Sequence, residues 1–159
     1  MSKVNLNLLL VNQSIGGLFN EVIKETSKIS NVDIFYGSTT SLIKDQKLFF
    51  KSIKYSNKSL IKRLITWLVF TIHLLLFLSI KSKKYNNILF VTNPPFSPLI
   101  GLFTKNSYSI LIYDLYPDII QNRFPKTSKL LPLKFIINIW IKLNSLSFKK
   151  ANYIFTLSN

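Results

Sequence analysis

The spacing of apolar and polar positions changes repeatedly along the chain, and it predicts alternating strands and helices. Short runs rich in β-branched and aromatic residues are typical of buried parallel strands. Segments with apolar residues three or four positions apart are typical of helices that cover a sheet. Strands are predicted at Val4 to Val11, Val32 to Tyr36, Leu48 to Tyr55, Ile88 to Thr92, Ser109 to Tyr113 and Asn152 to Leu157.

The segments between these strands supply the helices and turns. A turn is predicted at Asn12 to Gly17 and a polar loop at Ser38 to Gln46. The first helix has Leu18, Val22, Ile23, Thr26 and Ile29 on its apolar face. A short helix is expected around Leu99 to Thr104, and a long one at Pro132 to Phe148 with a polar stripe of Lys134, Asn138, Lys142 and Ser145. This alternation predicts one α/β domain over residues 1–159, a Rossmann-like parallel sheet of about five or six strands with helices on both faces.

The longest apolar run, Leu64 to Ile80, has no charged residue and allows two interpretations. Its length is at the lower limit for a transmembrane helix, which needs about 17–25 apolar residues. Thr66, Thr71, His73 and Ser79 dilute it. We therefore expect a buried or interfacial crossover helix packed on the sheet, with a transmembrane span as the alternative. His73 is expected to be half-buried and hydrogen-bonded, and Trp67 and Trp140 to be core residues or membrane-interface anchors.

Composition excludes several classes of site and points to an anionic partner. The chain has no cysteine and one histidine, so no thiolate site, disulfide scaffold or multi-histidine metal site is expected. Lysine and arginine number 21 against 6 acids, which gives a net charge of +15. An AT-rich coding sequence also produces such a lysine excess. Because arginines are few and lysines flank apolar runs, a membrane surface is favoured over nucleic acid.

The carboxyl ends of the strands are where open α/β sheets bind ligands, and unusual residues gather there. Gly16 and Gly17 precede a helix, where backbone amides can receive an anion, although a plain turn explains them equally well. Asn93, Pro94 and Pro95 follow another strand and form either a rigid binding wall or a simple strand end.

The sharpest candidates are two acids that follow the strand Ser109 to Tyr113. Asp114 at the strand end can act as a general base on a hydroxyl, or orient a sugar by accepting its hydroxyl protons. Asp118 has the same chemistry but also suits a helix N-cap. Tyr116 and Pro117 lie between the two carboxylates.

Three segments in this order resemble the N-terminal domain of family 4 glycosyltransferases of the colanic-acid and O-antigen type. They are Thr92-Asn93-Pro94-Pro95, Asp114-Leu115-Tyr116-Pro117-Asp118 and Lys150-Ala151-Asn152 through Ser158. The resemblance covers essentially the whole chain, and it departs at Asn152, where the family usually has Asp. It implies the N-terminal half of a GT-B enzyme, with Asp114 as candidate catalytic residue. Gly16, Gly17, Asn93, Pro94, Pro95, Tyr116 and Asp118 are then candidates for acceptor binding.

The resemblance also implies substrates and partners. A nucleotide-sugar is the expected donor substrate, with no further cofactor, and the acceptor is polyprenyl-phosphate-linked. The donor-binding domain is expected to be absent from this chain, so a truncated or split enzyme is expected, inactive alone and completed by a separate donor-domain chain. The expected location is the cytoplasmic face of the plasma membrane, bound peripherally to anionic lipid, with an integral protein as the alternative. A non-enzymatic basic membrane-associated protein is the competing function.

Overall fold

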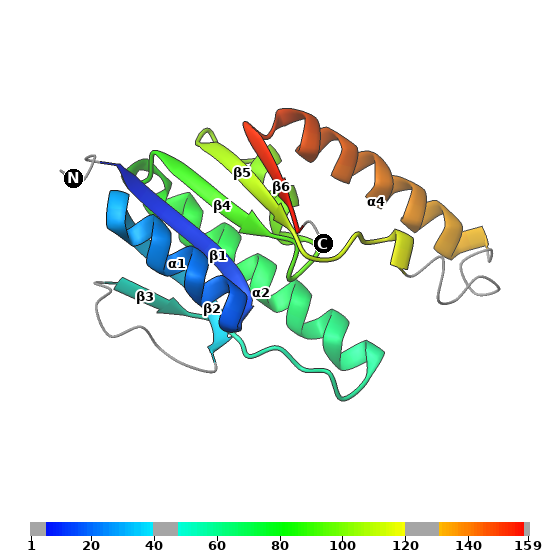
Figure 1. The fold of residues 1–159 in the computed structure, drawn as a ribbon. Coiled ribbons are helices and arrows are strands. Elements are labelled where there is room, and N and C mark those ends of the chain that lie inside the picture. The colour runs from blue at the N-terminus through cyan, green and yellow to red at the C-terminus, as the bar shows by residue number, and fades with distance from the viewer. Residues whose placement is uncertain (1–5, 40–47, 120–130, 158–159) are drawn as a thin grey trace.

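Six strands form one parallel sheet in a computed structural model, which describes residues 6–39, 48–119 and 131–157 (Figure 1). The strands are β1 (Asn7–Ile15), β2 (Asn31–Thr39), β3 (Leu48–Lys51), β4 (Asn87–Val91), β5 (Ser107–Ile112) and β6 (Tyr153–Thr156). Their order is β3-β2-β1-β4-β5-β6, which is the doubly wound order of dinucleotide-binding sheets. The expected α/β Rossmann-like fold is therefore confirmed.

Helices cover both faces of this sheet, as the sequence predicts. The helix α1 (Gly17–Ile29) joins β1 to β2 and covers one face, which we call the α1 face. The opposite face, called the α2 face, carries α2 (Leu60–Lys81), the 3₁₀ helix η2 (Ser97–Leu102) and α4 (Leu131–Lys150). A short 3₁₀ turn, η1 (Ser82–Lys84), continues α2 towards β4. The chain moves outward in one direction from β1 to β3 and in the other direction from β4 to β6. Right-handed crossovers that run in opposite directions place their helices on opposite faces of the sheet.

The core has two layers because side chains alternate along each strand. In β1, Leu9 and Val11 face α2, whereas Leu10 faces α1. The layer on the α2 face also contains Phe35, Phe70, Leu74, Leu78, Tyr85, Ile88, Phe90, Ile100, Tyr108 and Ile110. The layer on the α1 face contains Ile15, Phe19, Ile23, Val32, Ile34, Tyr36, Leu89, Val91 and Leu111. The predicted strands therefore supply the core, with the helices closing it from both sides.

Several predicted boundaries are wrong, and β1 is the most informative. The predicted turn at Asn12 to Gly17 is strand as far as Ile15, because Ser14 and Ile15 pair in register with Ser38 and Thr39 of β2. The strand β2 likewise continues through Gly37. The predicted third strand ends early at Lys51, and the loop residues 40–46 lie outside the described part.

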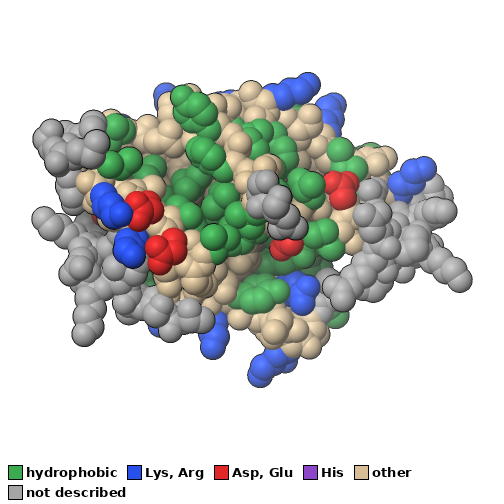
Figure 2. All heavy atoms as spheres, viewed as in Figure 1, with side chains coloured by type: hydrophobic (Ala, Val, Ile, Leu, Met, Phe, Trp, Pro, Cys, Tyr) green, Lys and Arg blue, Asp and Glu red, His purple; other side chains and the backbone are tan. Residues whose placement is uncertain are grey.

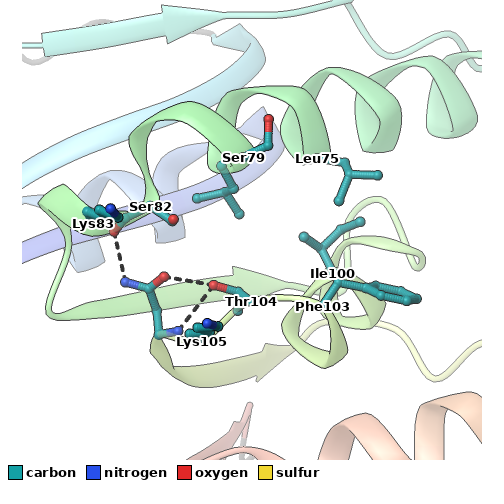
Figure 3. Close-up of a pocket in the computed structure, with 10 residues that line it drawn as sticks. Leu75, Ser79, Ser82, Lys83, Ile100, Phe103, Thr104 and Lys105 are labelled. Carbon is teal, nitrogen blue, oxygen red and sulfur yellow. Dashed lines mark hydrogen bonds between the residues drawn. The ribbon is translucent and has the colours of Figure 1, made fainter.

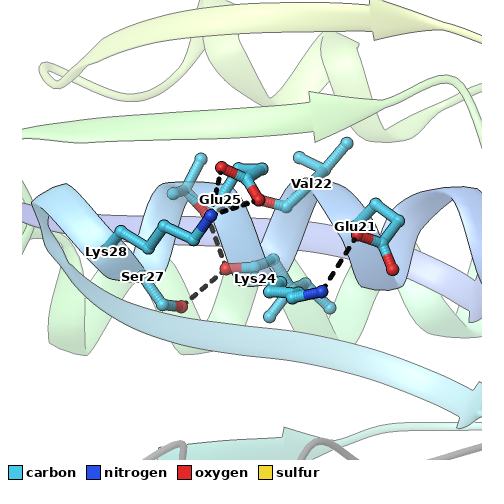
Figure 4. A network of polar contacts seen from close by, with 8 residues as sticks. Glu21, Val22, Lys24, Glu25, Ser27 and Lys28 are labelled. Atoms are coloured by element: carbon cyan, nitrogen blue, oxygen red, sulfur yellow. Dashed lines mark hydrogen bonds and ion pairs between the residues drawn. The ribbon is translucent and has the colours of Figure 1, made fainter.

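The predicted apolar face of the first helix is partly wrong. Phe19 and Ile23 are its buried residues, while Leu18 and Ile29 are 53% and 56% exposed. Glu21 pairs with Lys24 at 3.6 Å and Glu25 with Lys28 at 2.6 Å on the outer surface of α1 (Figure 4). The exposed side of α1 therefore carries charges of both signs. Figure 2 views the molecule from the α1 face and shows hydrophobic side chains gathered over the sheet beside α1.

The helix α2 packs on the sheet, as expected, and yet it is apolar on its outer side as well. Its inner side buries Trp67, Phe70, Leu74 and Leu78. Large apolar side chains also line its outer surface, which we call the α2 outer face: Ile61, Leu64, Ile65, Leu68, Ile72, Leu75, Leu76 and Ile80. Residues Ile61–Lys84 contain a stretch with the length and hydropathy of a membrane-spanning helix: an 18-residue window in this segment has a mean hydropathy of 2.0, and 28% of that window is buried. By composition, neither α2 nor α4 contains an acid.

Candidate functional site

The carboxyl ends of β1 and β4 lie side by side at the point where the strand order reverses. The backbone N–H of Gln13 donates a hydrogen bond of 2.8 Å to the carbonyl oxygen of Asn93. This bond carries the β1–β4 pairing past the last paired residues of the ladder, Val11 and Phe90. In open α/β sheets this reversal point is where ligands bind, because the flanking loops diverge to opposite faces.

Gln13 connects this edge of the sheet to the helix α2. Its side chain is fully buried, and Nε2 donates to the carbonyl oxygens of Thr66 at 3.0 Å and Ile53 at 3.4 Å. Alternation along β1 places Gln13 on the α2 face with Leu9 and Val11. Its Oε1 has no hydrogen-bond partner among the described residues, so a buried acceptor remains available there.

The other face of the same edge presents hydrogen-bond donors. Gly16 caps α1 without a side-chain hydrogen bond, and the first turn of α1 has no acid. A Cβ added to Gly16 or Gly17 would meet nothing within 4 Å, so open space surrounds these backbone groups. Alternation places the buried Asn12 on this face, and its Nδ2 has no partner within the described ranges. A helix N-terminus with open space around it is suited to an anion.

Thr92 fixes the start of the loop that carries Asp114. Its buried Oγ1 accepts hydrogen bonds from the backbone N–H groups of Tyr113 at 2.9 Å and Asp114 at 3.2 Å. The Asp114 carboxylate is exposed at the strand end, as the sequence predicts. In the neighbouring loop Ser97 donates its N–H to the carbonyl oxygen of Pro94 at 3.0 Å. The Asn93–Pro94 and Tyr116–Pro117 peptide bonds, one in each loop, are both cis.

Four aromatic rings from four separate elements meet behind these loops. Tyr116 lies 5.2 Å from Trp67 in an edge-to-face arrangement and 6.1 Å from Trp140 in a stacked one, measured between ring centroids. Phe96 completes the set at 4.7 Å from Trp140 and 6.2 Å from Trp67. Aromatic pairs at such distances stabilise each other beyond simple burial. This aromatic cluster therefore fixes the loops of β4 and β5 against α2 and α4, and both tryptophans are core residues, as expected.

Polar groups border the aromatic cluster at Tyr116. Burial of the phenol raises the pKa of Tyr116, and the negative charge of Asp114 raises it further. The Arg63 guanidinium opposes this effect through its charge and a hydrogen bond to the phenol. Arg63 also lies over the ring of Tyr55, with its Cζ 5.9 Å from the ring centroid. The charges of a carboxylate and a guanidinium thus act in opposite directions on the pKa of one phenol.

Asp118 lies in a groove between its own loop, α4 and β6, and Tyr116 lines the same groove. The groove has a volume of about 400 Å³ and is also lined by Ile141, Lys149 and Ile154. Asn144 of α4 donates a hydrogen bond of 2.6 Å to the carbonyl oxygen of Tyr116 and holds the loop above it. The chain is already helical at Asp118, and the residues that it would cap lie outside the described part.

The structure divides the predicted site residues into three groups. Asn93, Pro94, Pro95, Asp114 and Tyr116 occupy the adjoining loops that follow β4 and β5. Gly16 and Gly17 lie at the same sheet edge but on the α1 face, whereas Asp118 lines the α4 groove, which Tyr116 also lines. Of the predicted closing segment, Ser158 lies outside the described residues.

Sequence analysis missed Gln13, Arg63 and Tyr55. Arg63 had a usable signal, since it is one of two arginines among 21 basic residues. The expectation for His73 was half right: its Nδ1 lies 2.9 Å from Ser52 Oγ, but the residue is exposed. Within the described ranges no group of three histidine, cysteine or acidic side chains is placed to hold a metal ion.

No family model and no curated protein matches this chain.

Proposed function

We propose that this chain is the acceptor-side domain of a glycosyltransferase that works on a membrane surface. The observation that carries the proposal is the exposed Asp114 carboxylate at the carboxyl edge of the sheet, whose charge acts on the pKa of Tyr116 in opposition to that of the Arg63 guanidinium. A carboxylate there can take the proton of an acceptor hydroxyl, and a guanidinium can bind a phosphate. The order of the three resembling segments supports the same assignment.

In the proposed reaction Asp114 accepts the hydrogen bond of the acceptor hydroxyl and takes its proton. The hydroxyl oxygen forms the new bond to the anomeric carbon of the donor sugar, and the bond to the donor phosphate breaks. The nucleotide diphosphate leaves with the bonding electron pair. A donor-binding domain, which the resemblance assigns to the other half of a GT-B enzyme, holds the nucleotide-sugar, and the open edge beside Gly16 and Gly17 faces it.

The α2 outer face supports the choice of a membrane-bound acceptor. Exposed apolar side chains run along the helix, from Ile61 at 71% exposure to Ile80 at 77%. Lysines lie at both ends, and the helix has no acid to oppose anionic headgroups. Because the inner side of α2 packs in the core, lying in the interface preserves contacts that crossing the bilayer would break. We therefore propose peripheral attachment to the cytoplasmic face, with a polyprenyl-phosphate-linked acceptor reaching Arg63 from the hydrocarbon side.

A transfer assay tests this function. Bacterial membranes serve as the acceptor source with a panel of radiolabelled nucleotide-sugars, and the chain is supplied alone and together with a donor-domain chain. We expect label in lipid only when both are present. Asp114→Asn should reduce transfer by at least about a hundredfold, as expected for loss of a general base. Glu21→Gln, which removes an equally exposed carboxylate from α1, should leave transfer unchanged.

The competing function is a basic membrane-associated protein without transferase activity. The same α2 outer face favours it, because membrane attachment needs neither Asp114 nor a donor. Attachment to membranes without label from any donor, with the donor-domain chain present, would establish this second function and exclude the first. Nucleic acid is not a proposed partner.

A further inference from the structure

A second groove lies at the opposite end of the sheet from Asp114. It opens between the last turns of α2 and the loop that leads from η2 into β5, at the amino ends of β4 and β5 (Figure 3). Its volume is about 430 Å³. The residues that line it are Leu75, Leu78, Ser79, Ser82, Lys83, Ile100, Phe103, Thr104, Lys105 and Asn106.

The two ends of this groove differ in chemistry. Lys83 and Lys105 lie at one end, on opposite walls, whereas Leu75, Ile100 and Phe103 line the other (Figure 3). The side chain of Phe103 is 75% exposed although it is large and apolar. A groove with cations at one end and hydrocarbon at the other is complementary to an amphiphile that has an anionic head.

Hydrogen bonds between the walls fix the shape of the groove. Asn106 Nδ2 donates to the carbonyl oxygens of Ser82 at 2.9 Å and Tyr85 at 2.6 Å, which ties the end of α2 to the start of β5. Its Oδ1 accepts from Thr104 Oγ1 at 2.7 Å. Behind the η2 side of the groove, Lys150 of α4 donates Nζ to the carbonyl oxygens of Gly101 at 3.1 Å and of Leu102 and Thr104 at 3.3 Å. The groove is therefore preorganised, and these polar groups are already engaged.

The ammonium groups of Lys83 and Lys105 remain for a ligand. The ion pairs among described residues use Lys24, Lys28 and Lys84, and none involves either of the groove lysines. Both lysines are exposed, so an anion seated between the two walls can be attracted by both. A phosphate is the headgroup anion that two lysines bind well.

We propose that this groove binds one anionic phospholipid, with its phosphate between Lys83 and Lys105 and its acyl chains beside Leu75 and Phe103. Leu75 belongs both to the groove and to the α2 outer face, so a lipid seated here stays within the leaflet on which α2 lies. In this respect the inference rests on the membrane attachment proposed above. It adds a defined lipid site, far from Asp114, that fixes how α2 is oriented on the bilayer.

A titration with monomeric lipid tests the site without any membrane. Dihexanoyl-phosphatidylglycerol, kept below its micelle concentration, is added to the full chain while backbone amide signals are followed by NMR. We expect saturable shifts at Ser82, Lys83, Phe103 and Lys105. Lys83→Gln/Lys105→Gln should weaken binding by at least about tenfold, since two charge-assisted contacts are lost. Phe103→Ser should also weaken binding, because the apolar end loses its largest exposed side chain.

Controls exclude the alternatives to a phospholipid site. Lys51→Gln/Lys54→Gln removes the same charge from exposed positions at the carboxyl end of β3 and beyond it, and should leave the affinity unchanged. Inorganic phosphate binding as tightly as the lipid would overturn the proposal in favour of a simple anion site. Octyl glucoside binding as tightly would overturn it in favour of a general apolar patch.

Vesicles separate this inference from the proposed attachment of α2. Phosphatidylcholine vesicles with and without phosphatidylglycerol are sedimented with the native chain and the double lysine variant. Binding of monomeric lipid without any vesicle binding would contradict the attachment and support the groove. Equal vesicle binding by both proteins, with no shifts in the monomer titration, would support the attachment and overturn the groove.

Discussion

The phenol of Tyr85 donates a hydrogen bond of 2.9 Å to Oδ2 of Asp33, although 52 positions separate the two residues. Lys84 donates to the same oxygen at 2.6 Å, so one carboxylate near the amino end of β2 receives two donors from the residues just before β4. Asp33 therefore has a structural role. In dinucleotide-binding sheets the acid that binds the ribose follows the carboxyl end of β2, whereas Asp33 lies near the amino end.

Tyr85→Phe should change how stability depends on alkaline pH. Burial, then the bond to Asp33, raises the pKa of Tyr85 above its ordinary value. Below about pH 10 both folded and unfolded chains keep this proton, so the stabilisation is complete. At higher pH the unfolded chain loses the proton first, so stability falls as pH rises, by up to about 1.4 kcal/mol per pH unit.

Urea unfolding between about pH 8 and pH 11 measures this slope, since the range spans the ordinary tyrosine pKa. Tyr85→Phe should lower stability at pH 8 by about 1–2 kcal/mol, because a bond to a charged group is lost. It should also reduce the alkaline slope. An unchanged slope would show that Tyr85 does not carry the effect.

Gly101→Ala should destabilise the fold through the ring of Tyr108. A Cβ at Gly101 would come within 2.5 Å of Tyr108 Cζ, and that ring is 1% exposed, with its hydroxyl bonded to the carbonyl oxygen of Ser147 at 2.7 Å. The ring cannot move away without breaking this bond. We expect a loss of about 1–3 kcal/mol in the free energy of unfolding, typical of overpacking. Gly17→Ala is the matched control, because its Cβ meets nothing within 4 Å, and it should cause no loss.

Arg63→Gln should raise the pKa of Tyr116 further. The guanidinium lowers this pKa by its charge and its hydrogen bond, in opposition to burial and Asp114. The absorbance of ionised tyrosine is followed against pH in proteins with and without the Tyr116→Phe substitution. The difference between the two curves reports the ionisation of Tyr116 alone. Lys62→Gln removes a neighbouring exposed charge on α2 and should shift the titration less. A Tyr116 titration that moves to lower pH in Arg63→Gln would contradict the proposed arrangement of the site.

Leu68→Gln/Ile72→Gln should abolish most binding to vesicles. These side chains are 55% and 47% exposed on the α2 outer face, so their replacement should change stability little. Transfer of two such side chains into lipid contributes a few kcal/mol, so affinity should fall by at least about tenfold. Leu18→Gln/Ile29→Gln removes two equally exposed apolar side chains from α1 and should bind like the native chain. Sedimentation with vesicles containing phosphatidylglycerol compares the variants, and equal loss from both faces would contradict attachment through α2.

Local patterning was sufficient to predict the fold class and the position of each strand and helix core. Runs such as Ile88 to Thr92 bury both faces of a strand, and a continuous apolar run is the local signature of that environment. The sequence likewise placed Asp114 at a strand end, because strand ends are marked by the loss of apolar residues. The polar stretch Asn12 to Ser14 was mispredicted as a turn by this criterion. It continues β1, because Asn12 and Gln13 are buried and the stretch pairs with β2, a segment distant in the sequence.

The meeting of Tyr116 with Arg63, Trp67 and Trp140 was decided only by tertiary structure. These pairs join α2, the loop after β5 and α4, and no local spacing relates them. The exposure of the α2 outer face was also beyond the sequence, because periodicity measures how apolar a helix is and not which of its sides the sheet covers. A helix that is apolar all round is predicted to be buried on every side, but here the sheet covers only one side of α2 and leaves the α2 outer face exposed.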